Sequence, residues 1–190
     1  MTFRQQFILT VLDKGLLALI VAVAGYSLTK SIEAFKGRQA LENDLAKARD
    51  QKQLELLQSQ LSQFYWPVYL RLQMDNVVWE RLLQRCSNDH VRSQLGLRIE
   101  KDFILPNHEA TSNIIEANIH LAAPESQLMD AILKYLRHVA VYRALRAGGN
   151  DGIDPIAVGE PWPGDVFPAV REATLRKQRD FEALLKQRER

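Results

Sequence analysis

A chain of 190 residues is long enough for one compact domain with an additional segment, but too short for two large domains. Its formal net charge of +2 is too small to favour nucleic-acid binding through bulk electrostatics, so DNA is not an expected partner. The single cysteine, Cys86, excludes an intramolecular disulfide, and it has no companion ligand at a spacing that would hold zinc. We therefore expect no metal and no cofactor.

The first expected element is an apolar helix over residues 1–30, which we predict to be a single transmembrane anchor. The run 15–29, GLLALIVAVAGYSLT, contains no charged residue but is shorter than the roughly 20 residues that a span requires. Extended back towards the N-terminus it becomes long enough, with Asp13 and Lys14 near one membrane boundary and Lys30 after the run. A cleaved secretory signal and a buried soluble helix are the alternatives.

Basic residues are more frequent after the apolar run than before it. Only Arg4 and Lys14 precede it, whereas the basic residues that follow it include Lys30, Lys36, Arg38, Lys47 and Arg49. Because loops rich in lysine and arginine stay on the cytoplasmic side, we predict a bacterial inner-membrane protein with its C-terminal domain in the cytosol. A lone cysteine agrees with that reducing compartment.

Residues 31–64 predict a helical stalk, because they lack proline and are rich in strong helix formers. Their apolar residues form two runs that are out of phase with each other, so they make no continuous heptad seam: Leu41, Leu45 and Ala48, then Leu54, Leu57, Leu61 and Phe64. The stalk either packs on its own domain or associates with copies of itself. A short anchor containing Asp13 and Lys14 gains from neighbours that bury those charges, which favours a homo-oligomer.

Residues 65–190 predict a cytosolic helical domain, so the fold class is all-α: an N-terminal transmembrane helix, a helical stalk and a helical bundle. Pro67 is expected to end the stalk, because proline disfavours a helical residue before it. Pro106 and Pro124 are expected to open later helices, and a loop over 148–165 is rich in glycine, proline and aspartate. The helices are expected over 67–86, 89–104, 107–121, 124–147 and 166–188.

Two of these helices carry a charge within the stripe where their periodicity requires apolar residues. Asp75 lies in the stripe of 67–86, and Arg143 continues the stripe of 124–147, with Arg146 at its edge. A charge buried alone is unfavourable by several kcal/mol, so each needs a partner. Either Asp75 and Arg143 form a structural ion pair, or Arg143 and Arg146 face an anionic ligand, for which the planar guanidinium is well suited.

Aromatic and histidine residues supply further candidates. Tyr65, Trp66 and Tyr69 could stack nucleobases, or they belong to the core or to a membrane interface. Lys134, Arg137 and His138 are expected on the solvated face of 124–147, whereas His108 and His120 are expected to be core histidines. The segment 160–163 is expected to be a rigid surface loop in which Trp162 could seal a pocket.

Arg85 and His90 have the R-x4-H spacing of the HEPN ribonucleases, helical domains that use these two residue types to cleave RNA across a dimer interface. The alternative is that Arg85 favours the C-terminus of one helix and Asp89 caps the next.

The arrangement of an N-terminal membrane helix followed by a helical cytosolic domain resembles the small membrane effectors of bacterial antiviral systems, particularly those accompanying CRISPR loci. The resemblance implies an oligomeric, non-enzymatic membrane effector whose cytosolic domain binds an anionic signal, such as a cyclic oligoadenylate, and disturbs the membrane lipid. Ligand contacts would come from Arg143, Arg146, Tyr65, Trp66 and Tyr69. A membrane-tethered HEPN-like ribonuclease, and a passive scaffold for a partner protein, are the alternatives.

Overall fold

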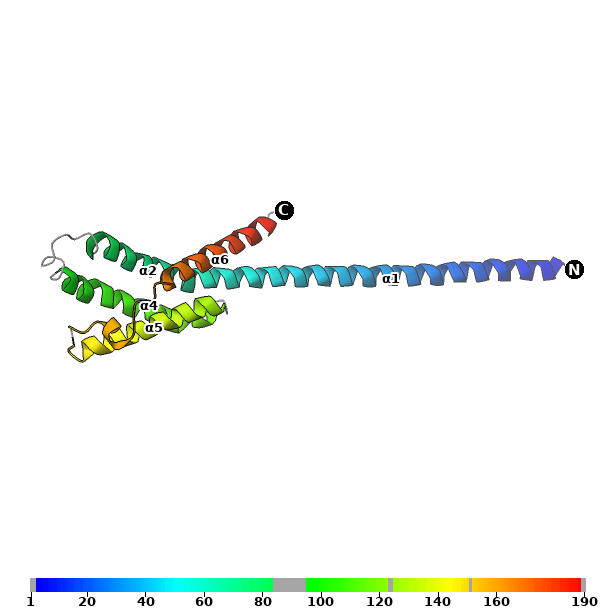
Figure 1. The fold of residues 1–190 in the computed structure, drawn as a ribbon. Helices are drawn as coiled ribbons and strands as arrows, with labels where there is room; N and C mark the ends of the chain where they lie inside the picture. The colour runs from blue at the N-terminus through cyan, green and yellow to red at the C-terminus, as the bar shows by residue number, and fades with distance from the viewer. Residues whose placement is uncertain (1–2, 84–94, 123–124, 151, 189–190) are drawn as a thin grey trace. The chain divides into compact units, whose positions relative to one another are not determined.

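The computed structural model describes residues 3–83, 95–122, 125–150 and 152–188, with side chains from Leu19 onwards apart from residues 20, 24 and 83. These residues form helices and connecting turns without any strand, which confirms the all-α class (Figure 1). The chain divides into two compact units, Met1–Lys52 and Gln53–Arg190. Arg85, Cys86, His90 and Pro124 lie outside the described residues.

The first unit consists of helix α1 (Phe3–Gln60) up to Lys52. Its described apolar side chains are exposed, among them Leu19, Val21 and Val23. Within the residues whose side chains are described, no helix is long and apolar enough to cross a membrane. The side chains of Asp13 and Lys14 lie outside that part of the chain. The transmembrane anchor therefore stays a prediction.

In the second unit the helix runs through Pro67, so the predicted break is wrong. A π-helical turn, η1 (Leu61–Tyr65), leads into α2 (Trp66–Val78), and the N–H of Trp66 donates to the carbonyl of Leu61. A π turn holds one extra residue and is wider than an α turn, which makes room for the proline ring against the preceding carbonyls. Trp66 itself keeps helical angles, with φ −64° and ψ −46°.

A π turn also precedes Pro106. The π turn η3 (Glu100–Ile104) leads directly into α4 (Leu105–Asn118), and the N–H of Leu105 donates to the carbonyl of Glu100. Pro106 therefore does not separate the predicted helices 89–104 and 107–121. A third π turn, η2 (Trp79–Leu83), follows α2.

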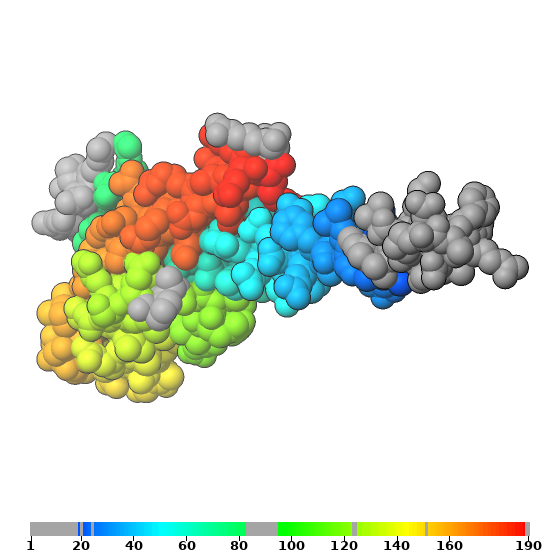
Figure 2. Space-filling view, turned by 90° about the vertical axis from the view of Figure 1, so that its right-hand side faces the viewer, coloured from blue at the N-terminus to red at the C-terminus, as the bar shows by residue number. Residues whose placement is uncertain are grey.

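The remaining helices are close to their predicted bounds. After a 3₁₀ turn, η4 (Ile119–Leu121), come α5 (Ser126–Ala147) and α6 (Val166–Arg188). The connection between α5 and α6 contains a second 3₁₀ turn, η5 (Pro155–Val158), which ends at Gly159 with a φ of +85°. That left-handed conformation favours glycine. Helix α6 packs on α5 and α2, and the space-filling view shows it on the surface beside α5 (Figure 2).

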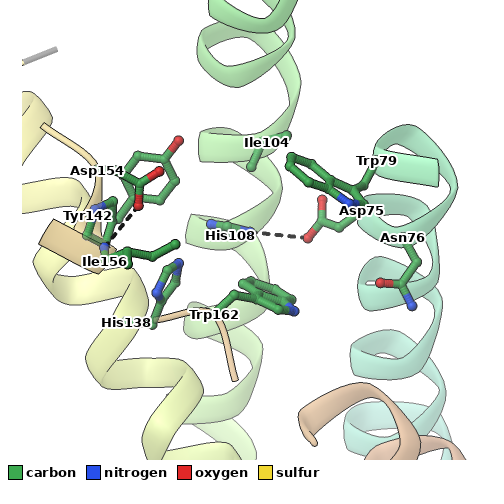
Figure 3. Close-up of a pocket in the computed structure, with 11 residues that line it drawn as sticks. Asp75, Asn76, Trp79, Ile104, His108, His138, Tyr142, Asp154, Ile156 and Trp162 are labelled. Atoms are coloured by element: carbon green, nitrogen blue, oxygen red, sulfur yellow. Dashed lines mark hydrogen bonds and ion pairs between the residues drawn. The ribbon is translucent and has the colours of Figure 1, made fainter. Parts of the chain in front are cut away.

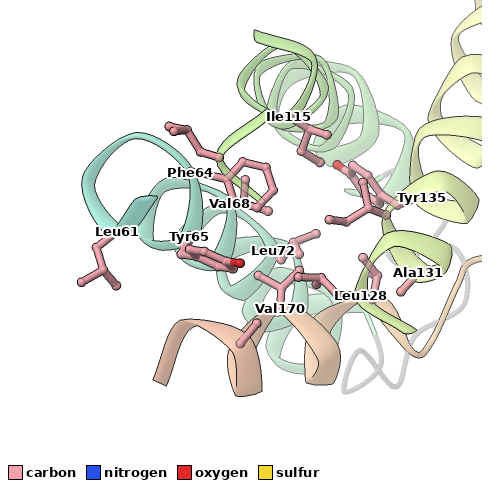
Figure 4. Close-up of a cluster of buried hydrophobic side chains, with 14 of the residues drawn as sticks. Leu61, Phe64, Tyr65, Val68, Leu72, Ile115, Leu128, Ala131, Tyr135 and Val170 are labelled. Atoms are coloured by element: carbon pink, nitrogen blue, oxygen red, sulfur yellow. The ribbon is translucent and has the colours of Figure 1, made fainter. Parts of the chain in front are cut away.

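One apolar core joins these helices. Its fully buried members come from η1, α2, α4, α5 and α6, and include Phe64, Tyr65, Val68, Leu72, Ile115, Ile132, Tyr135 and Val170 (Figure 4). Burial of each large apolar side chain stabilises the fold by roughly 1.5–3 kcal/mol. Leu57 and Leu61 are also buried, so the end of the predicted stalk packs on its own domain. This packing fixes α2, α4 and α5 around a cavity.

Candidate ligand-binding cavity

A cavity of about 340 Å³ lies where α2, α4, α5 and the connection before α6 meet (Figure 3). Aromatic rings dominate its wall. The residues that line it are Asp75, Asn76, Trp79, Ile104, His108, His138, Tyr142, Asp154, Pro155, Ile156 and Trp162. Two π turns border it, because Trp79 opens η2 and Ile104 ends η3. π turns interrupt the regular backbone and are frequent at functional sites.

His108 lies at the centre of the cavity wall and is only 3% exposed. Its ring stacks on Trp162, with the centroids 5.5 Å apart and the planes at 17°. Its Nε2 lies 3.4 Å from Oδ2 of Asp75 (Figure 3). Nδ1 of His108 is buried and has no hydrogen-bond partner among the described residues. The expectation of a buried histidine is confirmed, but one ring nitrogen remains unsatisfied.

Asp75 is buried, as its place in the apolar stripe predicts, with 6% exposure. Its Oδ1 accepts a hydrogen bond of 2.8 Å from Nδ2 of Asn107, which also donates to the carbonyl of Arg71 at 2.9 Å. Arg71 in turn donates from Nη1 to Oδ1 of Asn107 at 3.0 Å. The predicted ion pair between Asp75 and Arg143 is therefore wrong, since Asp75 contacts Asn107 and His108 instead.

Arg143 lies outside the apolar stripe of α5. It is exposed, and its Nη2 pairs with Oε1 of Glu109 at 2.9 Å. The inward stripe instead contains Leu128, Ala131, Ile132, Tyr135, His138 and Val139. Continued at helical spacing, that stripe reaches Tyr142 and Arg146 and passes Arg143 by. The stripe predicted through Arg143 differs from the observed one because Tyr135 and His138 occupy inward positions.

His138 is buried on this stripe, so its predicted place on the solvated face is wrong. Its Nδ1 lies 2.9 Å from the carbonyl oxygen of Glu160, which can only accept, so Nδ1 carries the proton. Burial lowers the pKa of His138, against the opposing effect of that carbonyl. The imidazole is therefore neutral at neutral pH, with Nε2 as an acceptor.

Arg146 holds the wall of the cavity rather than facing it. Its Nη1 donates to the carbonyls of Asn150 and Ile153 at 3.0 and 2.8 Å, and its Nε pairs with Glu100. Its guanidinium also lies over the ring of Tyr142, 4.8 Å from the centroid. Burial and the neighbouring Glu100 raise the pKa of Tyr142, whose phenol stays protonated.

The predicted aromatic cluster lies away from the cavity. Tyr65 is buried in the core, Nε1 of Trp66 is 3.4 Å from Oε1 of Gln178, and Tyr69 stacks on Phe167. None of the three lines the cavity, and the structure does not bring them together with Arg143 and Arg146.

The remaining predictions concern His120, Lys30 and a metal site. His120 is exposed, so its expected place in the core is wrong. Lys30 lies in the first unit, with Nζ 5.5 Å from the centroid of the Tyr26 ring. The described residues include no group of three or more His, Cys, Asp or Glu placed to hold a metal ion.

The cavity presents hydrogen-bond acceptors in an aromatic setting. Its carboxylates are those of Asp75 and Asp154, and its described lining includes no lysine or arginine. Trp162 lies on it, as the sequence suggested, whereas Trp79 and His138 were not expected there. The chain matches no model of a known protein family, no curated protein and no solved structure, so its function is inferred from this cavity.

Proposed function

We propose that the chain is a membrane-tethered sensor whose domain Gln53–Arg190 binds a small organic molecule in the cavity at His108. The observation that carries this proposal is that two residues of the cavity wall, His108 and Asp75, each contain a buried polar atom, Nδ1 and Oδ2, without a hydrogen-bond partner among the described residues. Each such atom is unfavourable by about 1–3 kcal/mol, and a bound molecule that supplies the missing partner removes that penalty.

The lining favours binding over catalysis. The cavity volume of about 340 Å³ falls in the range of small-molecule sites, roughly 300–1,000 Å³. The described lining residues include no serine, threonine, cysteine or lysine, the side chains that most often act as nucleophiles. Rings with a few polar atoms are typical of a site that holds a ligand by shape and hydrogen bonding.

The tether is supported by the apolar run 15–29, in which Leu19, Val21 and Val23 have exposed side chains. Apolar side chains gathered on one segment are unfavourable in water and need a cover of lipid or of other copies of the chain. We therefore retain the inner-membrane anchor, the homo-oligomer and the cytosolic domain as parts of the proposal, together with the resemblance to antiviral membrane effectors. A cyclic oligoadenylate is less suited to this cavity, because no lysine or arginine lines it within the described part.

The test is a thermal-shift screen of the full chain in detergent with four probe classes: small amines, nucleosides, aromatic acids and cyclic tetra-adenylate. We expect at least one class to raise the melting temperature of the wild type and of Trp66→Phe, but not of Trp162→Ala. Trp66 is the matched control because its ring contacts Gln178 and is not part of the cavity wall. A screen in which no probe separates Trp162→Ala from the wild type contradicts the proposal.

A further inference from the structure

We propose that the ligand of this cavity is a compact organic ammonium ion, held between the rings of Trp79 and Trp162 and the carboxylate of Asp75. This inference rests on the proposed function, because it names the chemical class that the same cavity binds. It follows from three properties of the wall: the kind of ring surface, the sign of the charge, and the hydrogen-bonding character of the unsatisfied atoms.

The rings offer surface to a cation. Trp79 is 58% exposed and Trp162 is 36% exposed, although both line the cavity. Tryptophan has the strongest attraction of any side chain for a cation placed over its face. Tyr142 has the guanidinium of Arg146 over its ring, and Trp162 is stacked on His108, so the ring surface open to a ligand is that of Trp79 and the exposed part of Trp162.

The charged groups of the wall have one sign. Asp75 and Asp154 line the cavity, and the nearby cations are engaged elsewhere: Arg146 pairs with Glu100, and Arg71 donates to Asn107. An anion entering here would face two carboxylates with no arginine or lysine among the described lining residues. An ammonium ion would meet the carboxylates directly.

The unsatisfied atoms accept hydrogen bonds. Oδ2 of Asp75 is an acceptor and is buried without a hydrogen bond, although Nε2 of His108 lies 3.4 Å away. Since a carboxylate faces Nε2, that nitrogen carries the ring proton and Nδ1 of His108 is also an acceptor. Nδ1 of His138 already donates to Glu160. The two unsatisfied atoms therefore require donors, which the N–H groups or the polarised methyl groups of an ammonium ion provide.

The experiment compares choline with its neutral isostere 3,3-dimethylbutan-1-ol on the full chain, by calorimetry and by tryptophan fluorescence, at matched ionic strength with sodium chloride. We expect choline to bind at least about tenfold more tightly than the isostere, the size of effect that a desolvated cation–π contact produces. Trp79→Leu removes an exposed ring without disturbing the core, and we expect it to weaken choline binding about tenfold, whereas Trp66→Phe leaves the affinity unchanged.

Asp75→Asn keeps the shape of the side chain and removes its charge. We expect it to weaken the preference for choline over the isostere and to leave the part of that preference that the tryptophan rings supply. Equal binding of the two compounds to the wild type overturns the ammonium assignment. Binding of adenosine in place of choline also overturns it, but leaves the cavity as a ligand site, so this failure is distinct from failure of the proposed function.

Discussion

The carboxylate of Asp75 lies between the cavity and a polar network buried beneath it. Asn107 donates to it and to the carbonyl of Arg71, so two helices are joined through one amide side chain. Asp75 could be recognised as buried from its place in the apolar stripe of α2. Its partner could not be recognised, because that depends on which face α4 turns towards α2. Asn107 is a polar residue that no apolar periodicity marks as inward-facing, and His108 was expected in the core without a partner assigned to it.

Asp75→Ala tests this network. We expect it to lower the free energy of unfolding by about 2–4 kcal/mol, because the amide of Asn107 and the ring of His108 lose a buried partner. Arg143→Ala should lower it by less than about 1 kcal/mol, because its pair with Glu109 is exposed to solvent. Urea unfolding followed by tryptophan fluorescence measures both. Equal decreases in the free energy of unfolding for the two variants would favour a direct pair between Asp75 and Arg143.

His138 gives the fold a dependence on pH. Burial lowers its pKa below the ordinary 6.5, so the unfolded chain binds its proton more readily than the folded chain. The stabilising contribution is complete above pH 6.5 and is lost as the pH falls from there through the lowered pKa. We expect the urea midpoint to fall as the pH is lowered from about 7 to about 5.

The matched variants for this prediction are His138→Asn and His120→Asn. Asparagine at position 138 can still donate to the carbonyl of Glu160 but does not titrate, so its urea midpoint should fall less steeply with acid. His120 is exposed and outside the cavity, and its replacement should leave the wild-type slope intact. An unchanged slope in His138→Asn would assign the acid sensitivity to other groups.

At the scale of whole elements, the helices that end at glycine or in a proline-rich segment were predictable, and those interrupted by an isolated proline were not. Helix α6 begins at Val166 and α5 ends at Ala147, both as predicted, because Gly148 and the following loop stop the helix. Pro67 and Pro106 predict helix boundaries from local sequence, but each lies within a continuous helical segment. Whether the residue before a proline can stay helical depends on the turn that precedes it. A π turn relieves the steric clash with the proline ring, and the helix propensities of single residues do not include this effect.

Hydrogen exchange on the full chain distinguishes a continuous helix from a break before Pro67. We expect slow exchange at the amides of Phe64, Tyr65 and Trp66, because all three lie within the helix and Trp66 donates to Leu61. The exposed residues Gly152 and Asp154 provide the fast-exchanging reference within the same sample. Rapid exchange at these three amides would mean that the helix ends there.

At the scale of the whole molecule, the N-terminal unit offers an apolar surface and the C-terminal unit offers a cavity. The anchor was predicted from the absence of charge in residues 15–29, and lipid is the cover that we propose for it. The core of Gln53–Arg190 could be anticipated in outline from apolar periodicity. The cavity could not, because its wall combines residues from α2, α4, α5 and a loop whose path no local pattern predicts.

Val21→Lys tests the anchor. A lysine in the middle of a membrane span is unfavourable by about 2.5–3.5 kcal/mol, so we expect the variant to move from the carbonate-resistant membrane fraction to the soluble fraction. Leu41→Lys makes the same kind of change at an exposed position outside the apolar run, and it should remain with the wild type in the membrane. A wild type found wholly in the soluble fraction contradicts the anchor.

The wall of the cavity is assembled from parts of the chain that are synthesised at different times. Trp79 and His108 emerge from the ribosome well before Trp162, whose ring closes over His108. Since a growing chain folds from its N-terminus, α2 and α4 can pack while this side of the cavity is still open to water. The apolar run 15–29 is therefore available to its surroundings before the helices of the domain are made, whereas the binding site exists only once Trp162 has been synthesised.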